Sequence, residues 1–469
     1  MIRMLRVRWV ITLLILLGRL AMMAPTAQAQ KTSEVSASQS VTTDKLPPWV
    51  WLDLELRSRT EGQTAINFLP DVSPLYDLTR VRTGIGVRAP KYFSAYLQMQ
   101  DTHALGLPLA FVASNMRDTF DFRQAYLQFK VGKTTTSVGR QELRFGDERL
   151  IGISNWTNNS RTFDVIHTAI GNPQNHIDLF SGSVVQVRPT DIDTPRNGFN
   201  LHGAYATLTT LVPHVRLEPY VLFKTPTVTS RQRITDREVL IAPGAHIVGT
   251  LPANFDYNLE GILERGSFAN NSIRAGAGYI KVGYTLKPLS WKPHIEAEYD
   301  YASGDSHRNP FVVSTFDQFS PSSHDVFGLT DLFGWQNIVQ RRINVDFHPA
   351  KTLYVLLHGE TLHVATTQDA VYTGSAGVLL APPAGGFRSD AIGKEIDGAL
   401  QYAWNRIPLV FELGVGHFWP GPLMSANNLG AERTLAYFQL TYIFKIGRGK
   451  SGDVTAVKVL PRQTLKLSK

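Results

Sequence analysis

From Trp49 to Phe444 the sequence repeats one pattern, in which stretches of alternating apolar and polar side chains are separated by turn-forming residues. The first clear stretch, 52–57, reads Leu-Asp-Leu-Glu-Leu-Arg. A β-strand sends successive side chains to opposite faces, so this spacing gives one apolar face and one charged face. The stretches have about the 9–11 residues that a tilted strand needs to cross a bilayer. About eighteen such stretches favour a transmembrane β-barrel.

The links between these stretches alternate in length. The links after the odd-numbered stretches are mostly long: 60–78, 102–119, 145–161, 304–335, 367–390 and 420–432. Tight turns follow the even-numbered stretches: 89–91, 131–133, 171–173, 212–214, 287–289, 348–350 and 404–406. Outer-membrane barrels have short periplasmic turns and longer extracellular loops. We therefore predict an all-β, antiparallel transmembrane β-barrel of about 18 strands in the bacterial outer membrane, in contact with its lipid.

The two ends of the chain differ from this repeating body. Residues 1–29 combine early arginines, an apolar run and the small-residue sequence Ala-Gln-Ala, which is the layout of a secretory signal peptide. Residues 30–48 are rich in Ser, Thr and Gln and predict a flexible N-terminal leader. We place the transmembrane β-barrel at 49–446 and a basic C-terminal tail at 447–469.

The formal net charge of +8 at pH 7 comes from the ends of the chain. Four arginines lie in the first nineteen residues, and seven basic residues follow from Lys445 onward, whereas the body is close to neutral. The charge therefore does not indicate a nucleic-acid partner. The basic tail is expected either to lie free in the periplasm or to contact a periplasmic partner, at the inner membrane or the cell wall.

The same alternation predicts which charged side chains face the lumen. An arginine-rich arc comes from the first five strands, and an acid-rich arc comes from strands eleven to seventeen. The pore-lining residues predicted in this way are Arg80, Arg82, Arg140, Glu142, Arg144, Arg216, Arg342, Glu395 and Asp397. Arginine suits carboxylates because its planar fork donates two parallel hydrogen bonds. The alternative is that these charges pair with each other and brace the wall; we favour Arg80, Arg82, Arg140 and Arg144 as solute-facing.

The sequence offers no arrangement of residues typical of an enzyme. Its Ser, His and Asp residues lack nucleophile-elbow spacing, and no pair of His has metal-ligand spacing on a helix. We predict no cofactor, with one weaker alternative. Asp300 and Asp305 lie where a loop begins and have the oxygen chemistry that calcium prefers, although a role in turning the chain is favoured.

Several segments carry a family resemblance. They are Val138 to Asp147 (VGRQELRFGD), Trp156 to Asn158, Arg161 to Asp164, Tyr299 to Asp305, Gln336-Asn337, and Ile392 to Asp397. Together they resemble the alginate-export family of outer-membrane proteins. The resemblance implies an eighteen-stranded barrel with a polar, arginine-lined channel for anionic polysaccharide or other anionic solutes. It also implies that Arg140 and Arg144 are pore residues, whereas Arg82 and Glu142 rest on strand alternation alone.

We therefore expect a passive outer-membrane channel for anionic, alginate-like polysaccharide or small carboxylated solutes, with no enzymatic activity. The alternative within the same class is a general or substrate-specific porin for other small polar solutes. Two further hypotheses belong to other classes. A barrel enzyme would place Ser/His or Asp/His pairs at adjacent strand tops, and a soluble secreted β-protein would be recovered without detergent.

Overall fold

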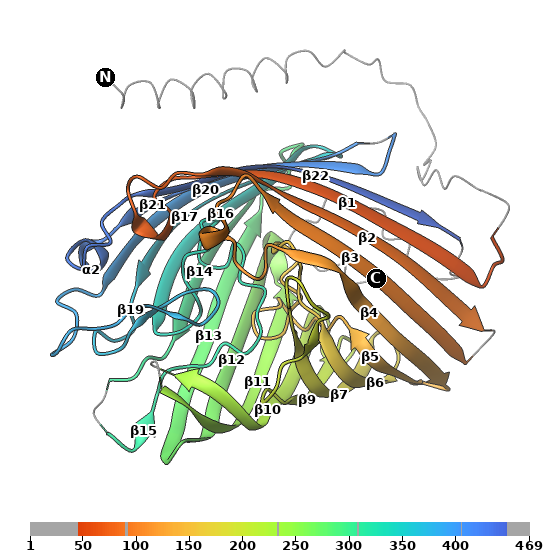
Figure 1. Cartoon of the computed structure of the whole chain (residues 1–469), viewed down its shortest axis with the longest axis horizontal. Coiled ribbons are helices and arrows are strands. Elements are labelled where there is room, and N and C mark those ends of the chain that lie inside the picture. Colours follow the sequence, from red (N-terminus) through yellow and green to blue (C-terminus); the bar gives the residue numbers. More distant parts are fainter. Residues whose placement is uncertain (1–45, 90–91, 232–233, 307–308, 405, 448–469) are drawn as a thin grey trace, which may run out of the picture. The chain divides into compact units, whose positions relative to one another are not determined.

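The computed structural model describes residues 46–89, 92–231, 234–306, 309–404 and 406–447 (Figure 1). The predicted signal peptide at 1–29, the leader up to residue 45 and the basic tail from 448 to 469 lie outside the described residues. The described chain is almost entirely strand and loop. Within it, no helix is both long enough and apolar enough to cross a membrane.

Eighteen long strands form one antiparallel sheet whose last strand pairs with its first. They are β1 (Val50–Gln63), β2 (Leu75–Ala89), β3 (Phe93–Leu105), β4 (Asp118–Val131), β5 (Thr134–Gln141), β6 (Phe163–Gly171), β7 (Asn175–Gln186), β9 (Leu201–Leu208), β10 (Val215–Arg231), β11 (Ile234–Thr250), β12 (Phe255–Phe268), β13 (Asn271–Thr285), β14 (His294–Ala302), β16 (Ile338–Ala350), β17 (Leu353–His363), β20 (Ala391–Ala403), β21 (Leu409–Pro420) and β22 (Arg433–Ile446). The register of β1 with β22 runs from Leu52 opposite Ile446 to Gln63 opposite Leu435. The sheet is therefore a closed barrel without edge strands, as predicted.

The shorter elements lie in the links between the barrel strands. They are β8 (Thr194–Pro195), β15 (Val312–Val313), β18 (Val371–Tyr372), β19 (Val378–Leu380), the 3-10 turns η1 (Ile66–Phe68), η2 (Leu109–Phe111) and η3 (Pro252–Asn254), and the single helical turn α2 (Pro422–Ser425). Tight connections such as 132–133 and 351–352 alternate with longer ones such as 142–162 and 303–337. The long-link side is the extracellular side of the barrel.

Strand β2 illustrates how alternation sorts side chains. Val81 and Ile85 are exposed on the outer wall, whereas Arg80 and Arg82 are buried on the inner side. Apolar side chains can face lipid because neighbouring strands of the closed barrel pair their backbone polar groups with one another. The sequence pattern therefore predicted both the strands and the side of the wall on which most charged residues lie.

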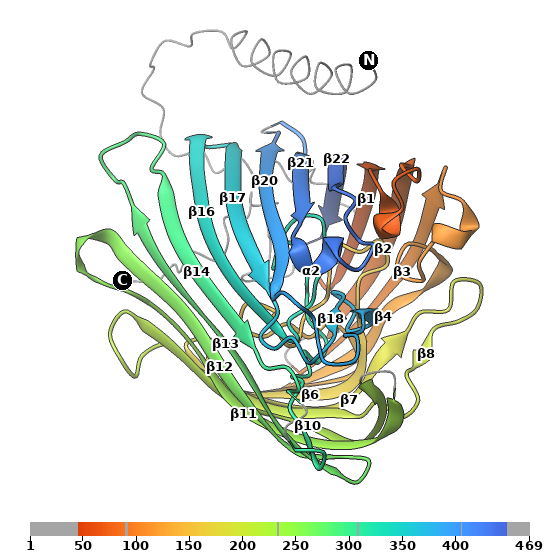
Figure 2. The same cartoon turned by 90° about the vertical axis from the view of Figure 1, so that its left-hand side faces the viewer.

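The lumen contains folded chain rather than an open, water-filled bore. Two long extracellular links turn inward: residues 142–162, here called the constriction loop, and residues 303–337, here called the packing loop (Figure 2). Phe316, Phe333 and Trp335 of the packing loop join Ile151 of the constriction loop in a buried apolar cluster. The two loops also pair through a bridge between Ile151 and Ser320. The apolar core of this protein thus lies inside the barrel.

Candidate functional site

The constriction loop crosses the lumen from wall to wall. On one side, Arg57 of β1 donates from Nη1 to the Asn155 carbonyl oxygen at 2.8 Å. On the other side, Arg149 of the loop forms ion pairs with Glu298 and Asp300 of β14. Strands β1 and β14 are far apart around the ring of strands. The loop is therefore the structural feature that narrows the passage.

Four arginines of β1 and β2 hold one turn of the constriction loop through its backbone. We call Arg57, Arg59, Arg80 and Arg82 the arginine cradle. The cradle donates to successive carbonyl oxygens: Arg57 to Asn155 at 2.8 Å, Arg59 to Trp156 at 2.7 Å, Arg80 to Asn158 at 3.3 Å and Arg82 to Asn159 at 3.1 Å. A guanidinium suits this task because it presents five donors and stays charged when buried.

The arginine cradle is balanced by acids and by an aromatic ring. Glu55 of β1 pairs with Arg80, and its other oxygen lies 3.6 Å from Arg82. The guanidinium carbon of Arg59 lies 3.5 Å from the centroid of the Trp156 ring. These contacts offset the repulsion between four neighbouring cations and the loss of their hydration.

The structure places Arg80 and Arg82 on the lumen side but covers them. Only 2% and 3% of their surfaces are exposed, because the constriction loop lies over them. The expectation that they face solute is therefore corrected: they donate to the constriction loop and, on the barrel wall, to Glu55 and Gln100. The sequence predicted that these side chains point inward, but it did not predict the loop that covers them and accepts their hydrogen bonds.

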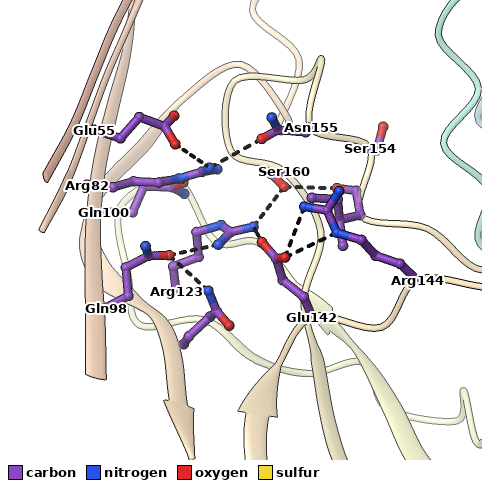
Figure 3. A network of polar contacts seen from close by, with 12 residues as sticks. Glu55, Arg82, Gln98, Gln100, Arg123, Glu142, Arg144, Ser154, Asn155 and Ser160 are labelled. Carbon is purple, nitrogen blue, oxygen red and sulfur yellow. Dashed lines mark hydrogen bonds and ion pairs between the residues drawn. The ribbon is translucent and has the colours of Figure 1, made fainter. Parts of the chain in front are cut away.

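The start of the constriction loop is fixed by a second polar network (Figure 3). Arg123 of β4 donates to Gln98 Oε1 at 2.7 Å and to Ser160 Oγ at 3.0 Å. It also pairs with Glu142 at 2.5 Å, and Glu142 in turn accepts from Arg144 at 3.0 Å. Burial alone would raise the pKa of Glu142, but Arg123 and then Arg144 lower it to about 2. Glu142 thus stays ionised and links the strand wall to Arg144.

The Glu142 network predicts an acid-sensitive constriction. Because the folded pKa of about 2 lies below the ordinary 4.5, the ion pair contributes fully above about pH 4.5 and is lost as pH falls toward 2. We expect single-channel conductance to rise or become noisier over that window and to recover on return to neutral pH. In Glu142→Gln this part of the pH dependence should be missing; an identical pH profile in that variant would contradict the prediction.

The far side of the constriction loop binds the acid-rich arc. Asp147 lies 3.3 Å from Lys281 Nζ and accepts from Asn258 Nδ2 at 2.7 Å. Burial disfavours the charged form of Asp147, yet Lys281 and its other cationic neighbours hold its pKa well below the usual range. For Arg149, burial opposes the charge, but Asp300 and Glu298 keep its pKa above the ordinary value.

The weak calcium alternative at Asp300 and Asp305 is corrected by these contacts. A carboxylate oxygen of Asp300 forms an ion pair with Arg149. Within the described residues, the groups of acidic and histidine side chains close enough to share an ion are Asp118, Asp121 and Asp193, and Asp256, His294 and Glu296. Neither group includes Asp300 or Asp305.

Two other predicted pore residues, Arg342 and Glu395, hold the packing loop, and a third, Asp397, contacts a histidine of the neighbouring strand β17. Arg342 of β16 donates to Asp325 Oδ1 at 2.6 Å, and Glu395 of β20 accepts from the Thr330 backbone N–H at 2.8 Å. Asp397 lies 2.6 Å from His358 Nε2. All three predicted residues point into the barrel and are buried. The contacts of these three residues agree with the alternative interpretation, in which charges in the lumen brace the structure.

Arg140 lies on the outer side of the wall, which corrects its prediction as a pore residue. It is directly opposite Ala125 and Asp164, two positions along from the outward Val138. Its guanidinium pairs with Asp164 at 2.9 Å and donates to the Asp193 carbonyl oxygen at 3.0 Å. Near Arg140, β5 has polar residues on both faces, so its sequence gives no sign of which face is inward.

Arg144 borders a cavity of about 390 Å³ beneath the constriction loop. The loop forms one wall with residues 142–146, and β6, β7, β9 and β10 form the other. Half of the Arg144 side chain is exposed. Arg216 pairs with Glu218, which lines the cavity, with 3.4 Å between Arg216 Nε and Glu218 Oε1. His176 and Thr207 lie near short turns, so the cavity is on the periplasmic side of the loop.

The cavity wall includes residues that sequence reasoning missed. His167 lies 2.7 Å from Asp178 across β6 and β7. The Phe145 and Tyr205 rings stack with centroids 4.7 Å apart, and Tyr205 continues the stack to Tyr220 at 5.3 Å. The inward parity of β6, β7 and β9 could have identified these wall positions. Their convergence with Phe145 depends on the path of the loop.

Solved structures with a similar fold are outer-membrane porins. OccK8 (OprE) of Pseudomonas aeruginosa superimposes with a TM-score of 0.59 at 11% identity, over 84% of this chain and 98% of its own. OpdK of Pseudomonas aeruginosa, solved with vanillate, has a TM-score of 0.57 at 12% identity, over 84% and 98%. OccAB4 of Acinetobacter baumannii has a TM-score of 0.57 at 11% identity, over 85% and 98%. No curated protein matches the sequence.

The closed eighteen-stranded barrel, together with the family match given below, defines the class: the protein is a channel of the bacterial outer membrane. Its fold and family are those of channels, not of enzymes. The sequence profile of the alginate export family matches residues 49–435. The chain therefore belongs to the alginate export family.

Proposed function

We propose that this channel passes small hydroxylated carboxylates, such as sugar acids, down their concentration gradient. The observation that carries the proposal is the half-exposed guanidinium of Arg144, which borders the cavity beneath the constriction loop. Its partners Glu142 and Glu148 orient it, with Nη1 of Arg144 3.3 Å from Glu148 Oε1. A guanidinium held in this way can donate to a carboxylate without first being ordered.

The other cavity groups suit the remainder of such a solute. Glu142, Asp178 and Glu218 are acceptors for the hydroxyl groups of such a solute. A cavity of about 390 Å³ lies within the range of roughly 300–1,000 Å³ that is usual for small-molecule sites. Mixed charge favours solutes that carry both an anion and several hydroxyl donors.

The loops favour small solutes over a polymer. The constriction loop is bound to both β1 and β14, and the packing loop is fixed to β16 and β20. A polysaccharide chain would have to displace several buried charged contacts at once. The vanillate bound by OpdK is likewise a small carboxylate, which supports this class of solute by analogy.

Block of ion current by uronic acids tests the proposal. In planar bilayers, galacturonate or mannuronate added to one side should transiently reduce the current through the unmodified channel. In Arg144→Gln we expect the apparent affinity to fall at least about tenfold, since a hydrogen bond to a charged group contributes about 1.5–3 kcal/mol. Arg188→Gln is the matched control, because Arg188 is similarly exposed but lies in an extracellular link.

Two outcomes would contradict the proposal. Unchanged block in Arg144→Gln would remove the role of the cavity arginine. Release of long polyuronate chains from vesicles that contain the unmodified channel would instead favour export of polysaccharide.

A further inference from the structure

Three aspartates meet at the extracellular rim, away from the cavity. Asp118 and Asp121 lie at the start of strand β4, and Asp193 belongs to the link 187–200 between β7 and β9. One carboxylate oxygen from each lies within 4.8 Å of the others. The three residues are only 2%, 5% and 9% exposed. Carboxylates gathered and buried in this way repel one another and lose hydration.

The hydrogen bonds around the cluster do not neutralise it. Asp121 accepts from the backbone N–H groups of Phe122 and Asp193, each at 2.5 Å, and Asp193 accepts from that of Arg188 at 2.7 Å. Asp118 has the Gln100 side chain as a hydrogen-bonding neighbour, yet its Oδ1 is buried without a partner. Among the described residues, no Lys, Arg or His lies in ion-pair contact with these three carboxylates.

Arg140 is the arginine whose charge acts on Asp121 and Asp193, and its guanidinium is already engaged. Arg140 pairs with Asp164 and reaches Asp193 through the backbone carbonyl oxygen rather than the carboxylate. Burial, together with Asp121, raises the pKa of Asp193 to about 6, although the Arg188 N–H works against the rise. A bound cation would offset this charge, and Asp118 Oδ1, which has no hydrogen-bond partner in the described part of the chain, is available to coordinate it.

We infer that Asp118, Asp121 and Asp193 form a binding site for a hard divalent cation of the calcium class. The donor set is all oxygen and contains neither His nor Cys, which favours calcium over zinc or copper. Three carboxylates supply up to six oxygens, and water completes the coordination shell of such ions. This site is independent of the solute proposed above.

The position of the site gives the cation a structural role. It joins the link 187–200 to the segment that holds the constriction loop. Asn159 of that loop donates to the Ser114 carbonyl oxygen at 2.7 Å and to that of Arg117 at 3.1 Å, directly before Asp118. A bound cation therefore stiffens both the outer link and the anchor of the constriction loop.

Calcium titration of the full-length, detergent-solubilised protein after chelator treatment tests the inference. Calorimetry should detect one calcium site, and calcium should raise the temperature of thermal unfolding. In Asp118→Asn and Asp193→Asn the dissociation constant should rise at least about tenfold, as expected when a ligand is removed. Asp191→Asn is the matched control, because Asp191 lies in the same link but is exposed.

Each outcome bears on the inference. Failure of the unmodified protein to bind calcium at about 10 mM, above the usual range of extracellular sites, would overturn it. Equal binding by the two ligand variants and Asp191→Asn would also overturn it. If the ligand variants do not fold, protection of the 187–200 link from proteolysis by calcium, but not by sodium, supports the site in the unmodified protein; equal cleavage with both salts overturns it.

Discussion

The double variant Arg80→Ala, Arg82→Ala is expected to have a single-channel conductance several-fold higher than the unmodified channel and to discriminate less between solutes. The two side chains donate to Asn158 and Asn159 of the constriction loop and pair with Glu55. Each charged hydrogen bond contributes about 1.5–3 kcal/mol, so losing several should free this end of the loop. Planar-bilayer recording of the purified variant measures both effects.

The barrel itself should survive this change. The β1–β2 register is made by backbone pairs, which alanine leaves in place, and removing two cations also relieves repulsion within the arginine cradle. On a denaturing gel, unheated samples of the variant should therefore still migrate differently from heated samples, which is the mark of a folded barrel. Arg88→Ala is the control on the same strand. The Arg88 guanidinium carbon lies 5.5 Å from the centroid of the Trp51 ring, which belongs to the barrel wall rather than to the constriction loop. Conductance equal to that of the control would refute the anchoring role.

Arg149→Met is expected to cause a larger loss of stability than the other substitutions, a decrease of about 3–5 kcal/mol in the free energy of unfolding. The change leaves Glu298 and Asp300, whose side chains are fully buried, without their common guanidinium partner. Lys281 remains 3.7 Å from Glu298 and offsets part of the loss. Urea unfolding in lipid vesicles measures the free energy.

A rescue experiment separates lost charge pairing from lost packing. Adding Glu298→Gln and Asp300→Asn to Arg149→Met removes the two negative charges that Arg149 balanced, so it should restore most of the stability. Arg144→Met is the control in the same loop; because Arg144 is half exposed, it should change stability by less than about 1 kcal/mol. If the triple variant were no more stable than Arg149→Met, charge pairing would not be the cause.

The strands of this protein could be predicted because their signal is local. In β2 the alternation of apolar and charged residues indicates which face contacts lipid, because the lipid-facing side requires apolar residues. Where this contrast is missing, the prediction was wrong. Arg140 follows a run of Thr and Ser in β5, both faces of which are polar, and it faces outward.

The site was only partly predictable because it depends on contacts between distant segments. Arg80 and Arg342 have the same sequence signature as a solute-facing arginine, yet each is covered by a loop that comes from elsewhere in the chain. Arg144 remained accessible because the constriction loop carries it into the cavity rather than against a wall. The aspartate cluster at the rim likewise joins residues more than seventy positions apart, Asp118 and Asp193.

The sequence by itself determined an eighteen-stranded outer-membrane barrel, the alternation of long and short links, and the sign of most charges facing inward. The tertiary structure alone decided which of those charges meet solute and which hold loops. The physical reason is range: strand alternation repeats every two residues, whereas the covering of an arginine depends on where a loop of some twenty or more residues folds back across the lumen.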